Sequence, residues 1–527
     1  MDFTNRLNHR ICSAYLVVLL SFFAVSSSSQ SLIETTPPLR NTLIILADDA
    51  GFELGVYRNK ICQTPNIDAL SKKSLIFNNA YTAVSSCSPS RSALLTGRPN
   101  HENGMYGLHN GYHNFNSLNK VDSLPKILSK HGIRTGIIGK KHVGPSKNYK
   151  FDYEQTEENN SILQVGRNIT KIKLLVREFL SQNKSKPFFL YVAFHDPHRC
   201  EHTHPEYGYF CEKFGNGEQG MGTIKDWTPI YYVPDQVEVP YFVQDTPYSR
   251  IDIAKQYTTI SRLDQGVGLV LKELKDAGHA NDTLIIYTSD NGIPFPAGRT
   301  NLYDSGMAVP LLMSTQEFPE RQNQVTYSLS SLLDVTPTVL DWFGIKYRPK
   351  MSPLQGKSLL PLLKKEPSFE EASASEVADD EPAVFASHSL HEVTMYYPMR
   401  VIRTKHFKLI HNLNYRMPFP IDQDFYVSLS FQDLLNRTEQ KQPLFWNRNL
   451  EEYYYRPEWQ LFDLRLDPEE TVNLISKPEL KDVITTLKRR LSDWQKATND
   501  PWICSPGGVL EGKISSKNSF CGPLYNH

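Results

Sequence analysis

The stretch Thr42-Leu-Ile-Ile-Leu-Ala47, which runs directly into Asp48 and Asp49, decides the fold of this chain. A short and continuously apolar run favours a strand that is buried on both faces of a parallel sheet. Similar runs and segments with helical periodicity alternate along the chain. The strand-like segments are residues 133–138, 187–194 and 283–288, and the helical ones are residues 66–73, 123–130, 169–181 and 250–276. This alternation predicts an α/β domain with a mostly parallel central sheet between helices.

The pattern changes after an acidic, Ala/Ser-rich segment at residues 366–382, which reads as a surface loop or linker. Residues 399–411 indicate an antiparallel strand pair, residues 459–464 another strand, and residues 480–494 an amphipathic helix. We therefore expect a smaller C-terminal α+β domain with an antiparallel sheet. The predicted divisions are a signal peptide at 1–29, a catalytic α/β domain at 30–382 and the C-terminal domain at 383–527.

The amino terminus has the pattern of a secretory signal peptide. Arg6 and Arg10 precede an apolar run at residues 14–25, and small residues at 26–29 offer a cleavage zone. A signal anchor is the alternative, but the run is short for a membrane span and no second run follows. Lys plus Arg balance Asp plus Glu at 57 each, so no global basic field favours nucleic acid. We expect a secretory-pathway protein with no stable membrane span and no nucleic-acid partner.

Sequons and cysteines agree with that route. The predicted glycosylation sites are Asn159, Asn168, Asn183, Asn281 and Asn436. Cys200 with Cys211, and Cys504 with Cys521, are close enough in sequence to close local disulfide loops, which would leave Cys62 free. Sequence does not fix the connectivity, so these pairings are a hypothesis.

Carboxylates follow two of the strand-like runs. Asp48 and Asp49 end the first, and Asp290 and Asn291 end the run at 283–288. Ligands of open α/β sheets collect at the carboxyl ends of strands, so Asp48, His195 and Asp290 are expected to converge. A turn or helix cap is the alternative reading of paired aspartates. Carboxylate and amide oxygens together favour a site for Ca²⁺ or Mg²⁺.

Cys87-Ser-Pro-Ser-Arg91 continues through a helical pattern to Arg98. We expect Ser88 to cap a helix whose first turn contains Pro89. Free N–H groups at a helix start attract anions, and Arg91 adds a positive charge one turn away. A reactive group at position 87 would face an oxyanion site; the alternative is a buried cysteine beside a capped helix.

Basic and imidazole side chains follow other strand-like runs. Lys140 and His142 lie in Gly139-Lys-Lys-His-Val-Gly144, and His195 and His198 lie in His195-Asp-Pro-His198. Arg299 follows the Asp290 loop. Lysine and arginine there can neutralise the oxygens of an anionic ligand, and histidine can move protons.

These elements, in this order, resemble the sulfatases of the alkaline-phosphatase superfamily. The resemblance runs from about residue 40 to about residue 505 and includes the C-terminal pattern at 459–474. It implies an alkaline-phosphatase-like fold and oxidation of Cys87 to Cα-formylglycine by a formylglycine-generating enzyme. It also implies one Ca²⁺ per subunit, with these ligands: Asp48, Asp49, Asp290, Asn291 and the modified residue 87.

The same resemblance implies catalytic roles. Arg91 would hold the hydrated aldehyde, and Lys140, His198 and Arg299 would bind the sulfate. The implied mechanism is double displacement through a covalent sulfo-enzyme, in which His142 removes a proton and His198 protonates the leaving nitrogen.

Within the family the nearest resemblance is to sulfamidases. It rests on residues 87–91, 104–108, 139–144, 194–200 and 290–296, and above all on Met417-Pro-Phe-Pro-Ile-Asp-Gln-Asp-Phe-Tyr426. It implies removal of N-linked sulfate from non-reducing-end N-sulfoglucosamine of heparan sulfate or heparin, in a lysosomal homodimer; we also expect an acidic pH optimum. An O-sulfatase on another sulfated sugar and an inactive glycosaminoglycan-binding relative are the alternatives. A phosphatase relative would carry Thr or Ser in place of Cys87.

Overall fold

The computed structural model describes residues 40–160, 165–182, 185–201, 207–366, 379–512 and 519–524. The predicted signal peptide and most of the predicted linker at 366–382 lie outside these residues. The span from Leu39 to His527 forms one compact unit. Among the helices of the described ranges, none is both long and apolar enough to cross a membrane. The domain boundary at residue 382 stays a prediction.

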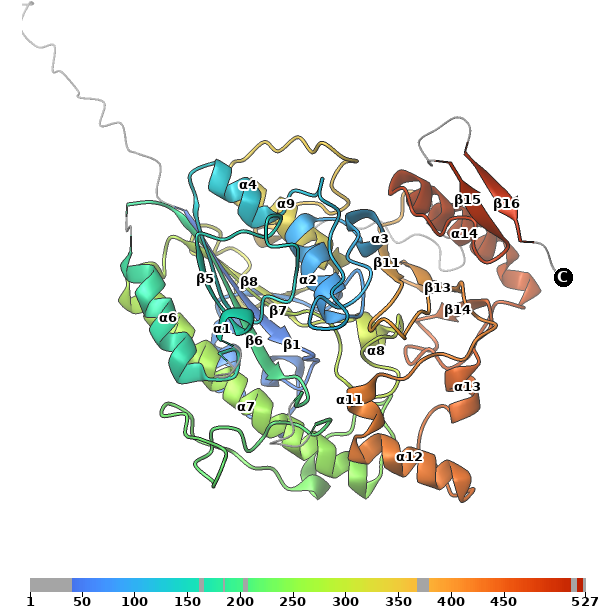
Figure 1. Ribbon diagram of the computed structural model, residues 1–527, viewed down its shortest axis with the longest axis horizontal. Helices are drawn as coiled ribbons and strands as arrows, with labels where there is room; N and C mark the ends of the chain where they lie inside the picture. Colours follow the sequence, from blue (N-terminus) through green and yellow to red (C-terminus); the bar gives the residue numbers. More distant parts are fainter. Residues whose placement is uncertain are drawn as a thin grey trace, which may run out of the picture. The chain divides into compact units, whose positions relative to one another are not determined.

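An eight-stranded sheet forms the centre of this unit (Figure 1), in the order β5-β4-β6-β1-β7-β8-β2-β9. Its strands are β1 (Asn41–Asp48), β2 (Leu75–Phe77), β4 (Arg134–Gly139), β5 (Tyr153–Thr156), β6 (Phe188–Pro197), β7 (Thr283–Ser289), β8 (Leu311–Ser314) and β9 (Gln324–Thr326). Only β8 pairs antiparallel with its neighbours within this sheet. The predicted mostly parallel sheet is confirmed, and every residue of β1 is buried.

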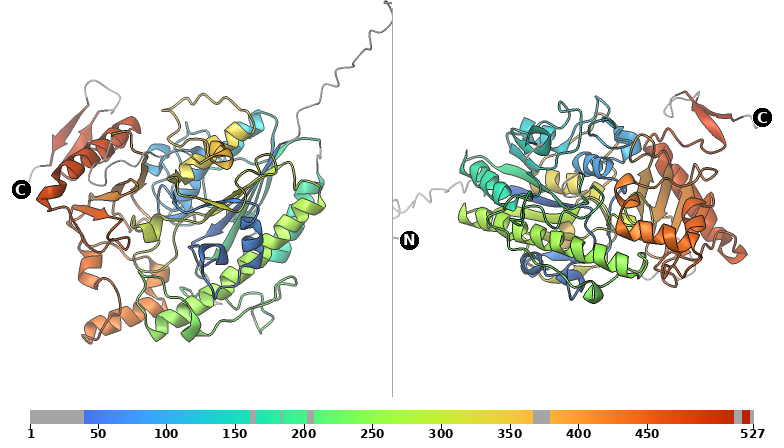
Figure 2. Two further views of the ribbon diagram at one scale, coloured as in Figure 1. Left: turned by 180° about the vertical axis from the view of Figure 1, so that it is seen from behind. Right: turned by 60° about the horizontal axis from the view of Figure 1, so that its bottom comes forward.

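Helices cover both faces of the sheet. On one face α1 (Pro65–Ser71), α6 (Ile169–Ser181) and α7 (Pro247–Asp276) pack against Leu43 and Ile45 of β1. On the other face α2 (Cys87–Thr96), α4 (Leu124–Lys130) and α9 (Val335–Trp342) pack against Ile44 and Leu46. Figure 2 shows the two layers from behind and from below. Double-sided burial explains why β1 is a continuous apolar run without alternation.

A second, antiparallel sheet follows in the chain, as the sequence predicts. Its order is β11 (Val384–His388), β12 (Met399–Arg403), β13 (Phe407–Asn412) and β14 (Trp459–Asp463). The amphipathic helix α14 (Lys481–Ala497) packs one apolar face, including Leu487 and Leu491, against this sheet. An antiparallel pair of strands, β15 (Gly508–Glu511) and β16 (Phe520–Pro523), lies near the end of the described chain.

Short elements complete the fold. They are β3 (Ala80–Tyr81), β10 (Ser330–Ser331), α3 (Asn100–Asn103), α5 (Glu157–Asn160), α8 (Asp304–Met307), α10 (Leu360–Lys364), α11 (Gln423–Tyr426), α12 (Leu429–Glu439), α13 (Leu450–Tyr454), and the 3-10 helices η1 (Gly55–Tyr57), η3 (Pro234–Gln236), η4 (Leu332–Asp334) and η5 (Pro478–Leu480).

The cysteines are arranged as predicted. Disulfides join Cys200 to Cys211 and Cys504 to Cys521, whereas Cys62 and Cys87 are buried and unpaired among the described residues. These two bonds close the short loops that the spacing favours.

Three of the predicted glycosylation sites have described side chains. Asn281 and Asn436 are exposed, and Asn168 caps α6 by accepting from Lys171 N at 3.0 Å. The side chains of Asn159 and Asn183 lie outside the described residues.

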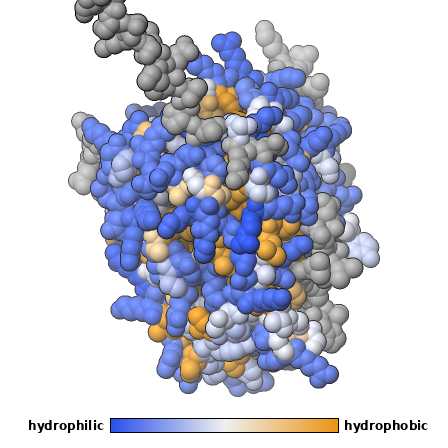
Figure 3. All heavy atoms as spheres, turned by 90° about the vertical axis from the view of Figure 1, so that its left-hand side faces the viewer, coloured by the Kyte–Doolittle hydropathy of each residue, from blue (hydrophilic) through white to orange (hydrophobic). Residues whose placement is uncertain are grey.

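The face in Figure 3 is mainly hydrophilic, with apolar side chains gathered in a few small groups.

Candidate active site

Four neighbouring strands carry the candidate site at one edge of the sheet. In the order β4-β6-β1-β7 all four run parallel, so their carboxyl ends meet. Lys140 follows β4, His198 follows β6, Asp48 ends β1 and Asp290 follows β7. The predicted convergence therefore has a topological cause: the strands are adjacent in space although they lie far apart in sequence.

Arg91 links three of these strand ends. Its Nη2 donates to Asp48 Oδ1 at 2.8 Å, its Nε to Asp290 Oδ2 at 2.9 Å, and its Nη1 to the carbonyl oxygen of Lys140 at 2.8 Å. Lys140 Nζ donates to Asp48 Oδ2 at 2.5 Å. Burial opposes the charge on Asp48, but Lys140 and Arg91 outweigh it and hold the pKa of this carboxyl well below its ordinary value.

Asp49 turns toward a second cation. It adopts a positive φ of 59°, and its side chain accepts from Arg299 Nη1 and, at 2.7 Å, from Asn291 Nδ2. Arg299 Nη1 also lies 2.9 Å from His198 Nε2. The guanidinium of Arg299 is 1% exposed, so this cluster is screened from bulk water.

Cys87 is the first residue of α2, and its Sγ lies 3.9 Å from Asp49 Oδ1. The predicted cap at Ser88 is wrong: Ser86 is the N-cap residue, and Ser88 lies inside the helix, where its hydroxyl accepts from His109 N at 2.8 Å. Burial raises the pKa of the Cys87 thiol well above its ordinary value, and the nearby Lys140 ammonium offsets this rise only in part. An unmodified thiol here is therefore a poor nucleophile.

The carboxylates fit a hard cation. Ligand atoms of Asp48, Cys87 and Asp290 lie within 4.8 Å of one another. Burial raises the pKa of Asp290 to about 7 and that of Asp49 well above its ordinary value, because neighbouring cations compensate them only in part. Asn291 Oδ1 is buried and has no hydrogen-bond partner among the described residues. An orphaned oxygen beside under-compensated carboxylates is the environment that Ca²⁺ or Mg²⁺ stabilises.

The two predicted catalytic histidines differ in their contacts. Both ring nitrogens of His142 are buried without a hydrogen-bond partner among the described residues, and burial and Lys140 hold its pKa well below the ordinary value. A neutral imidazole with a free lone pair suits a proton acceptor. His198 Nδ1 lies 2.8 Å from the carbonyl oxygen of Arg199, so Nδ1 carries the proton and Nε2 accepts from Arg299.

Glu157, Asp422 and Asp424 also lie at the site, although the sequence patterns assign them no role. Glu157 Oε1 lies 2.8 Å from His195 Nδ1, and His195 Nε2 lies 3.8 Å from Asp48 Oδ2. Asp422 and Asp424 both accept from Arg299 Nη2. The two aspartates lie in the distinctive segment Met417–Tyr426, which is the signal that could have found them; Glu157 has no comparable motif.

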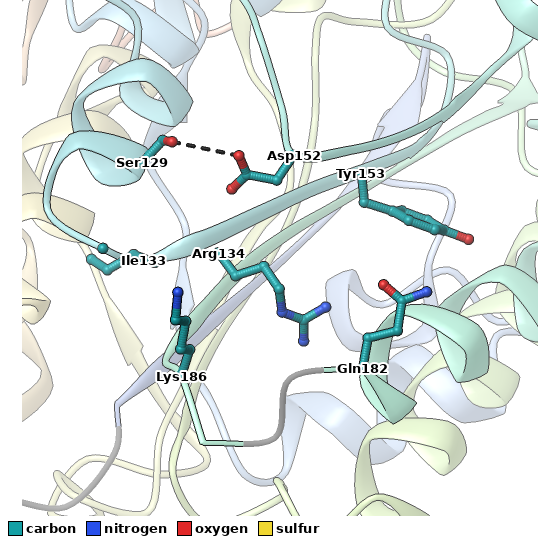
Figure 4. A pocket seen from close by; sticks show the side chains of 8 residues that line it. Ser129, Ile133, Arg134, Asp152, Tyr153, Gln182 and Lys186 are labelled. Atoms are coloured by element: carbon teal, nitrogen blue, oxygen red, sulfur yellow. Dashed lines mark hydrogen bonds between the residues drawn. The ribbon is translucent and has the colours of Figure 1, made fainter.

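A cavity of about 290 Å³ lies apart from this site, at the amino end of β4 (Figure 4). Arg134 lines it together with Asp152 and Lys186. The guanidinium of Arg134 lies 3.8 Å from the centre of the Phe179 ring and donates to Phe179 O at 2.8 Å. Both contacts hold Arg134 against α6. The residues that line the cavity include none of the candidate site at the carboxyl ends of the strands.

A protein-family model described as Sulfatase matches residues 40–345. The chain belongs to the sulfatase family. This sulfatase is 59% identical over 493 residues to N-sulphoglucosamine sulphohydrolase from Homo sapiens, covering 92% of this chain and 95% of that protein. An N-acetylglucosamine-6-O-sulfatase from Bacteroides thetaiotaomicron is 24% identical over 580 residues, covering 93% of this chain and 92% of that protein.

Solved structures agree on the fold of this sulfatase. A protein in complex with its substrate D-glucosamine-2-N,6-O-disulfate superposes with a TM-score of 0.60 at 19% identity, covering 88% of this chain and 98% of that chain. A 2-O glycosaminoglycan sulfatase gives a TM-score of 0.59 at 19% identity, covering 92% and 98%. These likenesses confirm the predicted α/β architecture with its second, antiparallel sheet.

Proposed function

We propose that this sulfatase removes the N-linked sulfate from non-reducing-end N-sulfoglucosamine of heparan sulfate or heparin. The observation that carries the proposal is the 59% identity, over nearly the whole of both chains, to N-sulphoglucosamine sulphohydrolase. The buried cluster around Cys87 supports it, because cations and carboxylates are gathered there as a sulfate hydrolase requires.

Residue 87 is the proposed site of the nucleophile, as formylglycine. The high pKa of the buried thiol supports a converted side chain over a thiolate. Mass spectrometry of the peptide that spans position 87, in secreted and purified protein, tests this directly. Formylglycine is the expected result, and an unmodified cysteine throughout would contradict it.

Ca²⁺ is the proposed metal, held by Asp48, Asp49, Asp290, Asn291 and residue 87. A bound divalent cation would offset the negative charge of the sulfuryl oxygens. The orphaned Asn291 Oδ1 and the raised pKa of Asp290 support this set.

The chain's own side chains divide the remaining work. Arg91 orients the group at position 87. Lys140, His198 and Arg299 contact the sulfate, and the charges of Lys140 and Arg299 offset its negative charge. His142 accepts a proton, which agrees with its neutral state. His198 is the proposed acid for the leaving nitrogen; it must take up a proton at Nε2 first, because that atom accepts from Arg299 here.

The substrate proposal has a matched assay. Glucosamine carrying a single sulfate on nitrogen is compared with glucosamine carrying a single sulfate on O6, at equal concentration and with calcium present. Faster release of sulfate from nitrogen is expected. Faster cleavage of the O-sulfate would replace the proposal with an O-sulfatase, and no cleavage of either by formylglycine-containing protein would favour an inactive relative.

The cellular setting is also proposed. The signal-like amino terminus and the sequons support delivery to the lysosome through the secretory pathway, and the family resemblance supports a homodimer. Sedimentation of the purified protein tests the second point, and staining of expressing cells against a lysosomal marker tests the first.

A further inference from the structure

Arg299 is held on two sides by different parts of the chain. On Nη1 it contacts Asp49 and His198, which come from the edge of the parallel sheet. On Nη2 it donates to Asp422 at 2.7 Å and to Asp424, which come from the chain that follows the antiparallel strand β13. A planar guanidinium with defined partners on both terminal nitrogens has little freedom to rotate.

A second set of contacts runs from Asp422 to the start of α2. His391 Nε2 lies 2.8 Å from Asp422 Oδ2, the same oxygen that accepts from Arg299. His391 Nδ1 lies 2.8 Å from the hydroxyl oxygen of Ser86, which is the N-cap residue of α2 and immediately precedes Cys87. Both ring nitrogens are thus occupied, so His391 has the contacts of a connector and not those of a free acid or base.

These contacts form a closed path that includes residue 87. The path runs from Ser86 through His391 and Asp422 to Arg299 and Asp49, and Asp49 lies 3.9 Å from the sulfur of Cys87. Asp422 and Asp424 are only 2% and 4% exposed. Burial opposes the charge of Asp422, but Arg299 and His391 hold the pKa of this carboxyl below its ordinary value, so it is anionic.

We propose that His391, Asp422 and Asp424 are positioning residues, which hold Arg299 at a fixed place relative to residue 87 so that it meets the sulfate. The proposal rests on the sulfate contact assigned to Arg299 above. The contacts of these three residues are with Arg299 and Ser86, not with the side chain of residue 87, so they act through those two neighbours. His391, Asp422 and Asp424 thereby complete a site whose other members precede residue 300.

Charge and geometry predict opposite effects when Asp422 is neutralised. A carboxylate that only lowers the local positive potential would, on removal, tighten the binding of an anion. A carboxylate that orients Arg299 would, on removal, weaken it, because the guanidinium would leave its place. The sign of the change therefore separates a positioning role from a bulk electrostatic one.

The test is calorimetric titration of inorganic sulfate into the calcium-loaded full chain. Asp422→Asn is expected to weaken sulfate binding about tenfold, within the range seen for residues that orient a ligand contact. Arg299→Gln should weaken it further, and the double variant should bind no more weakly than Arg299→Gln alone, since Asp422 acts only through that side chain. Equal losses from Asp422→Asn in both backgrounds would overturn the proposal, as would unchanged or tighter binding in the single variant.

Matched variants guard against unfolding. Asp433→Asn removes another buried carboxylate from the same part of the chain, where Asp433 pairs with Arg437, and sulfate binding should not change. If Asp422→Asn does not fold by its thermal midpoint, His391→Gln and Asp424→Asn give the same readout, and binding as tight as wild type in both would overturn the proposal. Because sulfate binding needs no turnover, a wild type that binds sulfate but leaves N-sulfoglucosamine intact would contradict the proposed function alone.

Discussion

Arg91 Nη2 donates to Asp48 Oδ1 at 2.8 Å, and the side chains of both residues have no exposed surface. The same guanidinium binds Asp290 and the backbone of Lys140, so one side chain joins the ends of β1, β4 and β7. A buried cation shared between two carboxylates supports both the fold and the site.

Removal of that cation should destabilise the protein strongly. In Arg91→Met, Asp48 and Asp290 lose a buried partner, and we expect the free energy of unfolding to fall by about 3–5 kcal/mol. Urea denaturation measures the loss. The control is Arg489→Met, whose half-exposed pair with Asp493 should cost less than about 1 kcal/mol. Equal losses in the two variants would contradict the prediction.

Asp49→Ala should lose activity chiefly through loss of metal. The remaining carboxylates carry too little charge to hold a divalent cation at its former affinity. Metal analysis of dialysed protein should find less than one calcium per chain, and activity should return in part at high calcium. Asp226→Ala, which removes a surface partner of Lys173, is the control. Full activity at unchanged calcium content would exclude Asp49 as a ligand.

The rate should be highest below neutral pH. Burial and Lys140 hold the pKa of His142 well below the ordinary value, so its basic form persists as the pH falls and is lost only in stronger acid. We expect a pH–rate optimum on the acid side, and His142→Gln should lower kcat by about 10²–10⁴-fold. His131→Gln, on an exposed ring, should leave the profile intact. An optimum above neutrality would count against the assignment.

Mild acid should stabilise the fold through Asp334. Burial raises the pKa of this carboxyl to about 6, although it accepts from Ser331 N and Lys357 N, both at 2.8 Å. Because the folded pKa exceeds the unfolded one, the contribution is complete below about pH 4 and is lost as the pH rises through about 6. From pH 7 to pH 5, Asp334 should therefore add about 1 kcal/mol.

The role of Asp334 is tested by comparing how much the free energy of unfolding rises on acidification in the wild type and in a variant. Urea denaturation at pH 5 and pH 7 should show that Asp334→Asn gains less stability on acidification than wild type. Asp341→Asn, which changes an exposed carboxylate on α9, should gain as much as wild type does. The same gain in Asp334→Asn would show that this carboxyl has no raised pKa.

Local patterns predicted the parts of the fold that local physics decides. The apolar run before Asp48 is a strand because it is buried on both faces, and α7 fills the predicted helix at 250–276 with three extra residues at its start. The predicted cap of α2 is wrong because Ser86 and Ser88 have equal capping chemistry. In the folded chain Ser86 has the extended backbone of an N-cap residue, whereas Ser88 is already helical.

Local patterns could not predict contacts between residues that are far apart in sequence. Asp422 is 123 residues from Arg299, and His391 is 305 residues from Ser86. No periodicity links residues that meet only when the two sheets are packed, so a role for the distinctive segment around Asp422 required the folded chain.

The burial of Cys87 imposes an order in time. Its side chain is 1% exposed, so the surface of another enzyme cannot reach the sulfur once α2 is packed in place. Some of the side chains of the site, such as His391 and Asp422, are synthesised several hundred residues later. Any conversion of Cys87 must therefore happen while the chain is still open, in competition with folding. The fraction of active molecules then depends on the rate of conversion relative to the rate of folding. A variant that folds faster would contain a larger fraction of unconverted, inactive protein.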